Sequence, residues 1–122
     1  MNTTDQKKIA KDFLVLVGTG KVEEGYQHVA NDFIHHNQYF KGDRASLKLA
    51  MTEAHKEDPN EAIEVKNIYQ DGDSVITHSL IKKKDMEIAV VHIFRFREDE
   101  IIELWDLGQK IEEDGPNENG LF

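Results

Sequence analysis

Two ionisable side chains stand in the second half of the chain at positions where an ordinary core would hold only apolar groups. His92 and Asp106 lie in the stretch 87–109, whose alternation is typical of two β-strands joined by a charged turn. Because residues two apart on a strand share a face, His92 falls in line with Phe94, and Asp106 falls in line with Leu104. Burying a charge costs hydration free energy, so this placement indicates either a satisfied polar network or the wall of a ligand pocket.

Asp106 is the candidate general base. It follows Trp105 and precedes Gln109 by three residues, and an indole and aliphatic groups around a carboxylate are expected to raise its pKa. A carboxylate of this kind suits the removal of a proton from a carbon next to a carbonyl group. The alternative is a structural aspartate that caps the end of the strand or pairs with an arginine.

A second polar group, His35-His36-Asn37, follows an apolar pair and precedes Tyr39 and Phe40. An imidazole and a carboxamide there could donate hydrogen bonds to a developing enolate oxygen. Adjacent side chains of an extended chain point in opposite directions, so at most one of His35 and His36 faces a pocket. The alternative is a loop in which one histidine is exposed and the other is satisfied by the backbone.

His78 shares the parity of Ile76 and Leu80 on a preceding strand, which predicts that it faces inward with His92 and Asp106. Two histidines and one carboxylate could in principle hold a transition metal. Inward histidines also occur as hydrogen-bonded pocket walls, and no short metal-binding signature such as His-Glu-x-x-His is present. We therefore expect neither a metal nor an organic cofactor.

The elements that must position these groups change period near residue 60. Helical spacing predicts a first helix that ends at Gly18, a short second helix over Val22–Val29, and a third helix that Asp43 caps and that Pro59 stops. Four strands joined by short turns then predict an antiparallel meander. Its expected features are a bulge near Lys66–Asn67, a hairpin turn at Asp71-Gly72-Asp73, a strand over Ser74–Lys82, and charged turns at 82–85 and 97–100.

Helices followed by a bent antiparallel sheet predict an α+β fold, a cone-shaped sheet of four to six strands whose concave face the N-terminal helices cover. The outer face of this sheet is also expected to be mostly apolar, which predicts a homodimer through that face unless a helix covers it. The residues predicted for the outer face are Val75, Thr77, Ser79, Ile81, Ala89, Val91 and Ile93.

Composition narrows the class of function. The 122 residues are expected to form one domain, 1–122, and the absence of cysteine excludes disulfides, thiolate catalysis and zinc–sulfur sites. A net charge of −9 repels phosphate backbones and anionic membrane surfaces, so we expect neither a nucleic-acid nor a membrane partner. No apolar run suits a signal peptide or a membrane span, which favours a cytoplasmic location.

Several segments together resemble the SnoaL-like polyketide cyclases, within the NTF2-like, ketosteroid-isomerase-like superfamily. They are Phe33-Ile34-His35-His36-Asn37, Gly42-Asp43-Arg44, Val91-His92-Ile93-Phe94-Arg95-Phe96, Glu103-Leu104-Trp105-Asp106-Leu107-Gly108-Gln109 and the Asn-Gly-Leu-Phe ending. The resemblance implies a dimeric cone-shaped barrel with an apolar pocket, whose cyclase members perform an intramolecular aldol condensation without a cofactor. It matches Asp106 to the acidic residue that acts as base, and His36 and Asn37 to a His-Asn pair at the pocket mouth.

Two departures separate this chain from many of those relatives. Leu104 stands where a histidine is common, and His92 stands where an acid is common. A specific cyclase activity therefore does not carry over. We expect either a cofactor-free enzyme acting on a small hydrophobic carbonyl compound or a non-catalytic binding protein for a small apolar metabolite. If His92 meets Asp106 across the strands, the pair becomes an acid–base dyad and the pKa of Asp106 falls; otherwise Asp106 is a lone base. The candidate catalytic residues are Asp106 and His36, and the candidate substrate-binding residues are Asn37, His78, His92, Trp105, Gln109, Phe94 and Leu104.

Overall fold

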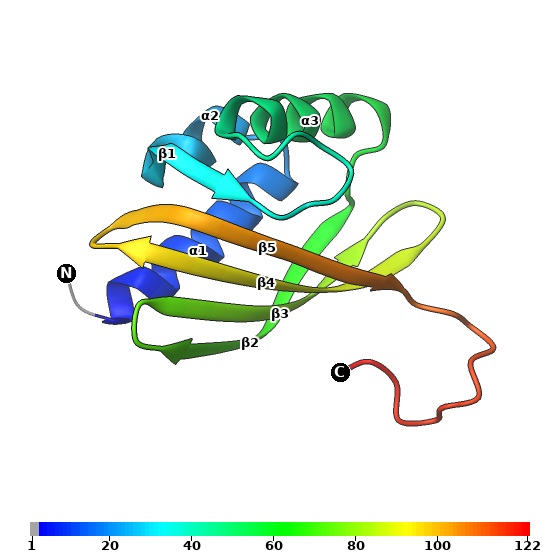
Figure 1. The fold of residues 1–122 in the computed structure, drawn as a ribbon. Coiled ribbons are helices and arrows are strands. Elements are labelled where there is room, and N and C mark those ends of the chain that lie inside the picture. The colour runs from blue at the N-terminus through cyan, green and yellow to red at the C-terminus, as the bar shows by residue number, and fades with distance from the viewer. Residues whose placement is uncertain (1–2) are drawn as a thin grey trace.

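A computed structural model describes residues 3–122 and consists of helices packed on one curved sheet (Figure 1). None of the helices in this described range is long and apolar enough to span a lipid bilayer. The elements are α1 (Thr3–Gly18), α2 (Val22–Gly25), the 3-10 turn η1 (Tyr26–His28), β1 (Val29–His35), α3 (Arg44–Glu57), β2 (Ala62–Asp71), β3 (Ser74–Lys82), β4 (Glu87–Arg97) and β5 (Glu100–Lys110).

The helices begin and end largely where the sequence predicts. The side chain of Asp43 accepts a hydrogen bond from the backbone N–H of Ser46, 3.2 Å away, and caps α3 as predicted. That helix ends at Glu57, before Pro59. The second predicted helix is shorter than expected, because Tyr26–His28 tightens into a 3-10 turn before β1 begins.

The sheet has the strand order β1-β5-β4-β3-β2, and β2 to β5 form the predicted antiparallel meander. The predicted α+β fold, with helices covering the concave face of a curved sheet, is thereby confirmed. One strand departs from the prediction of a purely antiparallel sheet, because β1 pairs with β5 in the parallel direction. The polypeptide leaves β1 through α3 and three further strands before it returns beside it, so no local turn signals this pairing.

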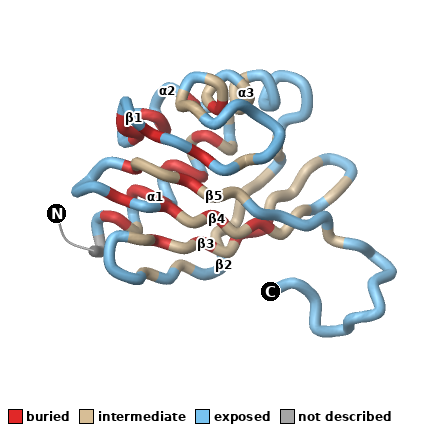
Figure 2. Tube along the Cα trace, in the orientation of Figure 1, coloured by how far each residue is buried: buried red, intermediate tan, exposed pale blue. Residues whose placement is uncertain are grey.

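The core lies between α1 and the inner face of the sheet. Phe13 on α1 meets Phe94 on β4 edge-on at a centroid distance of 5.8 Å, and Phe94 is completely shielded from solvent. Buried segments gather on α1 and on the strands that it covers, whereas the C-terminal tail is exposed (Figure 2). Burial of one helix stripe and one sheet face is what joins the two layers.

The predicted bulge in β2 is confirmed, since the β2–β3 register shifts between Val65 and Asn67. A second bulge was not predicted. Phe96 of β4 pairs with Ile101 of β5 and Arg95 pairs with Glu103, which leaves Ile102 as the extra residue. Its consequence is that Ile101, instead of the predicted Ile102, shares the inner face with Leu104 and Asp106.

Strand β3 presents the opposite face from the one predicted. Val75, Thr77 and Ser79 are buried and lie opposite inner-face residues of β4, so His78 points outward. Both parities of this strand are rich in residues that suit a sheet interior, and alternation alone therefore did not distinguish them. The outer face carries Ile76, His78, Ala89, Val91, Ile93, Trp105 and Leu107, and the aromatic ring of Phe122 stacks on His78 at 4.6 Å.

Candidate functional site

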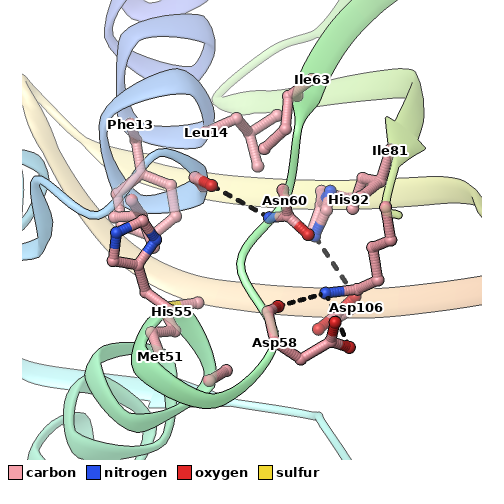
Figure 3. A pocket seen from close by; sticks show the side chains of 14 residues that line it. Phe13, Leu14, Met51, His55, Asp58, Asn60, Ile63, Ile81, His92 and Asp106 are labelled. Atoms are coloured by element: carbon pink, nitrogen blue, oxygen red, sulfur yellow. Dashed lines mark hydrogen bonds and ion pairs between the residues drawn. The ribbon is translucent and has the colours of Figure 1, made fainter. Parts of the chain in front are cut away.

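A cavity of about 170 Å³ lies between α1, α3 and the inner face of the sheet. Its walls are mainly apolar: Phe13 and Leu14 come from α1, Met51 from α3, and Ile63 and Ile81 from β2 and β3. On the sheet side, His92 and Asp106 add a polar pair to this wall and point toward one another from β4 and β5 (Figure 3). An apolar enclosure with a few convergent polar groups is the usual form of a small-molecule site.

Asp106 also reaches a larger, open hollow of about 650 Å³. This hollow lies where the loop after β1 meets the ends of β4 and β5, and Asn37, Tyr39 and Ile88 are among the residues that line it. Asp106 and Ile81 belong to both spaces. The carboxylate therefore borders both the cavity beneath the helices and the larger hollow beside the loop.

His92 and Asp106 lie directly opposite one another in the β4–β5 register. The Nε2 atom of His92 is 3.2 Å from Oδ1 of Asp106, which decides between the two alternatives that the sequence leaves open: the two side chains meet. The amide of Asn37 donates a hydrogen bond of 2.9 Å to the other oxygen, Oδ2. Both carboxylate oxygens thus have a partner, and the plane of the carboxylate is fixed from two sides.

Burial raises the pKa of Asp106, but the hydrogen bond and positive charge of His92 and the hydrogen bond from Asn37 outweigh that cost and hold it below its ordinary value. The expectation of a raised pKa was therefore wrong. It assumed that the Trp105 indole surrounds the carboxylate, whereas adjacent residues of a strand point to opposite faces and Trp105 lies outside.

The imidazole of His92 is 9% exposed, and its second nitrogen, Nδ1, is buried without a hydrogen-bond partner among the described residues. Phe94 and Leu104 are sealed in the core on the same inner face, where the ring of Phe94 lies 6.0 Å from that of His92. Chemically, the pair can hold a carboxylate in a fixed orientation beside an imidazole that can donate or accept a proton. It is an acid–base arrangement open to a cavity.

The two histidines after β1 point in opposite directions, as predicted. His35 faces inward, where Nδ1 accepts a hydrogen bond from the backbone N–H of Asn37 at 3.1 Å and Nε2 lies 2.7 Å from the carbonyl oxygen of Lys41. His36 faces outward, with Nε2 2.7 Å from Oε2 of Glu103. His36 lines the larger hollow together with Asn37 and Asp106, and Asn37 is the member of the group that bonds to Asp106; a catalytic role for His36 stays a prediction.

Three further candidates lie on the outer face and not in the cavity. His78 stacks on Phe122, Trp105 stacks on His36, and Gln109 is exposed opposite Ala89. The inverted parity of β3 accounts for His78, and alternation with the inward Asp106 places Trp105 and Gln109 on the outer face. Because His78 points outward, it does not join His92 and Asp106 in a metal site. Between residues 3 and 122, no three His, Cys, Asp or Glu side chains lie close enough to hold a metal ion.

The polar rim of the cavity was not predicted. Lys83 Nζ lies 2.8 Å from the backbone oxygen of Asp58 and 3.3 Å from its Oδ2, and His55 and Asn60 stand nearby (Figure 3). The sequence places Lys83 in a charged turn and His55 on a charged helix face, both of which suit solvent. No spacing in the sequence brings the end of α3 to the β3–β4 turn.

The arrangement of the elements matches solved structures. Comparison of the sequence with protein-family models gives no match, and comparison with curated protein sequences gives none either. An NTF2-like protein of unknown function from Burkholderia xenovorans LB400 superposes with a TM-score of 0.76 at 16% identity, covering 93% of this chain and 89% of that one. The fold is NTF2-like.

Other NTF2-like matches differ in what they do. An LEH-like epoxide hydrolase from M. tuberculosis has a TM-score of 0.70 at 16% identity, with 88% of this chain and 84% of that chain covered. A de novo designed protein with a curved β-sheet has a TM-score of 0.73 at 15% identity, with 87% and 86% covered. An enzyme and a designed chain share this architecture, so function must come from the site and not from the NTF2-like fold.

Proposed function

We propose that this protein catalyses proton transfer on a small hydrophobic carbonyl compound without a cofactor, in a reaction of the aldol-cyclisation or isomerisation type found among SnoaL-like proteins. The observation that carries the proposal is the His92–Asp106 pair in the wall of a cavity whose other inner walls are apolar and whose rim is polar. Perturbed acids in a cavity with a specific partner are typical of catalytic sites.

In the proposed reaction the Asp106 carboxylate accepts a proton from the carbon next to the substrate carbonyl. The electron pair of the broken C–H bond moves onto the carbonyl oxygen and forms an enolate. In an isomerisation the proton returns to another carbon; in a cyclisation the enolate carbon attacks a second carbonyl and the new alkoxide takes the proton. Either route regenerates the carboxylate, so the step balances without an oxidant or reductant.

The partners of Asp106 support this role. The lowered pKa keeps the carboxylate ionised at neutral pH, at the expense of some base strength. His92, which lowers that pKa through its hydrogen bond to Oδ1, can in turn carry the proton away from the carboxylate, and the two side chains act as an acid–base dyad. Asn37 fixes Oδ2 where Asp106 borders the larger hollow.

The second candidate is a non-catalytic binding protein for a small apolar metabolite. The small volume of the enclosed cavity and its mainly apolar walls favour it, since burial of apolar surface alone can hold such a ligand. The two candidates differ in whether Asp106 changes the substrate.

Hydrogen–deuterium exchange separates them. Cyclohexanone and 2-tetralone are incubated with the protein in D₂O, and loss of the α-proton NMR signals is followed. The wild-type protein is expected to accelerate exchange over buffer, and Asp106→Asn is expected to lower that acceleration at least about 100-fold because the proton acceptor is gone. The matched control Asp12→Asn removes an exposed carboxylate of α1 and is expected to leave the rate unchanged.

Cavity amide resonances recorded with the same ketones give the other outcomes. Shifts at cavity residues without accelerated exchange would identify a binding protein. Neither shifts nor exchange would reject the proposed substrate class.

A further inference from the structure

The segment His35-His36-Asn37 joins the two faces of the sheet at its β1 edge. Its backbone stays in the sheet, because the N–H of His36 donates to the carbonyl oxygen of Leu104 at 2.9 Å. The side chains on either side of that bond go opposite ways: His36 lies on the outer face, and Asn37 reaches Asp106 from the inner side. One peptide unit therefore separates an outer contact from the proposed catalytic carboxylate.

The outer contact is built from three neighbours. The ring of His36 stacks on Trp105 at a centroid distance of 4.7 Å and an interplanar angle of 9°, and its Nε2 lies 2.7 Å from Glu103 Oε2. Glu103 is itself held by Arg95, whose Nε donates to Oε1 at 2.8 Å and whose Nη2 lies 2.6 Å from the same oxygen. The carboxylate of Glu103 is only 12% exposed, so it is a fixed anchor and not a mobile surface group.

The inner contact depends on the direction of one amide. Asn37 Nδ2 donates to Asp106 Oδ2, while Oδ1 of the same amide accepts the backbone N–H of Tyr39 at 3.0 Å. These two bonds require the loop after β1 to keep its position over β5. On the inner side His35 also holds this loop in position, because its ring bridges the N–H of Asn37 and the carbonyl oxygen of Lys41.

We propose that His36 is a positioning residue for the active site: from the far face of the sheet, its contacts with Glu103 and Trp105 hold Asn37 on Asp106. Loss of these contacts lets the loop shift, and a hydrogen bond of 2.9 Å is lost with a displacement of under about 1 Å. The consequence for catalysis rests on the proposed function, whereas the coupling between the two faces does not.

The test follows the side-chain carboxyl of Asp106 by ¹³C NMR as the pH is varied. A hydrogen bond to the ionised form lowers a carboxyl pKa, so its loss raises the pKa. Asn37→Ala removes the hydrogen bond completely and gives the reference change. The pKa of Asp106 is expected to rise by at least about half a unit, which is a threefold rise in the proton affinity of the carboxyl. His36→Ala is expected to give at least half of that rise. His36→Gln, which can still donate to Glu103, is expected to restore most of the wild-type value.

The matched control is His78→Ala, which removes another outer-face histidine from an aromatic stack but lies on β3, away from the loop. It is expected to leave the titration of Asp106 unchanged. The other titratable groups that face Asp106 or line its cavity are His92, His35, His55, Asp58 and Lys83, and all variants retain them.

Several outcomes would overturn the inference. It is rejected if His36→Ala titrates like the wild type while Asn37→Ala does not, or if Asn37→Ala itself has no effect. Should His36→Ala fail to fold, as judged by circular dichroism, Glu103→Gln removes the anchor's charge with little change of shape and must raise the pKa in its place. The titrations test the coupling between the two faces even if the ketone exchange assay shows no activity. Failure of this inference and failure of the proposed function are therefore distinguishable.

Discussion

Strand β5 carries two carboxylate–histidine pairs, one on each face of the sheet. Inside, Asp106 meets His92 at 3.2 Å; outside, Glu103 meets His36 at 2.7 Å. The pKa of each carboxylate is lowered: burial and His92 act in opposite directions on Asp106, and the hydrogen bond from His36 is the largest influence on Glu103. The chemistry of the two pairs is nearly the same, but the cavity between the helices and the sheet is lined by the inner pair and by neither member of the outer pair.

What distinguishes them is the covering layer. The helices turn one side of the sheet into an interior, where Asp106 must be desolvated and a bound molecule would be held against it. On the other side Arg95 gives Glu103 a second cationic partner, and solvent lies close by. The same residue types thus form a candidate active site on one face and an anchor on the other. The difference between the two faces is expected to show in stability, association, titration and acid unfolding.

The largest expected difference is in stability between two leucines of β5. Leu104 is 1% exposed on the inner face, and Leu107 is 57% exposed on the outer face. Leu104→Ala is expected to lower the free energy of unfolding by about 2–5 kcal/mol through lost burial and a residual cavity. Leu107→Ala is expected to change it by less than about 0.5 kcal/mol in the monomer. Urea unfolding measures both, and equal losses would show that the outer face is covered as completely as the inner one.

The next effect concerns the outer face as an interface. We propose a homodimer through this face, because its apolar residues are shielded only in part and the tail covers only the end near His78. Sedimentation equilibrium is then expected to give twice the 14.0 kDa chain mass. Leu107→Lys places a charge in that face and is expected to weaken the dimer at least about tenfold. A wild-type monomer at micromolar concentration would contradict the proposal.

A third test compares the two pairs directly. His92→Asp replaces an attraction by a like-charge repulsion beside a largely buried carboxylate, so the pKa of Asp106 is expected to rise by at least about one unit. His36→Asp makes the same change beside Glu103, where Arg95 and solvent reduce the repulsion, and the rise is expected to be smaller. Side-chain ¹³C titrations read both values. Rises of equal size would mean that the cavity does not change the electrostatics of the inner pair.

The smallest effect is in acid stability. Because the folded pKa of Asp106 is depressed, its ionisation contributes stability that is present above the ordinary value of 3.8 and is lost as the pH falls through the folded value. Asp106→Asn is therefore expected to unfold with a shallower loss of stability below about pH 4 than the wild type. Denaturant unfolding at several acidic pH values measures the slope. An unchanged slope would mean that His92 and Asn37 do not stabilise the ionised carboxylate.

The sequence predicted the inner face of β4 correctly, because Phe94 and Phe96 flank His92 on one parity and charged arginines occupy the other. The same prediction failed for β3. The alternating residues that include Val75 and those that include Ile76 are both suited to a sheet interior, and neither set carries a charge until the strand ends. A face can be assigned by alternation only when the other face is clearly polar.

The candidate site was predicted in part for similar reasons. Alternation anticipated that Asp106 and His92 share the inner face, but whether they meet depends on the β4–β5 register, which the sequence leaves open. Alternation also required His35 and His36 to diverge, but which of them faces inward depends on the parallel pairing of β1 with β5, a contact between segments far apart in the chain. The cavity walls from α1 and α3 have the same helical spacing as ordinary core residues, and no local signal separates the two.

The single extra residue in β5 decides what the cavity contains. Ile101 faces inward, and an uninterrupted strand would continue with Glu103, Trp105 and Leu107 on that face. Ile102 shifts the phase, so Leu104 and Asp106 enter instead. Deleting Ile102 would remove the bulge but keep this phase, because Leu104 would then follow Ile101 two positions on and Asp106 four positions on. The bulge thus lets β5 carry one extra residue while an acidic side chain still enters the cavity; pairing Ile102 regularly with β4 would instead put an indole where the carboxylate stands.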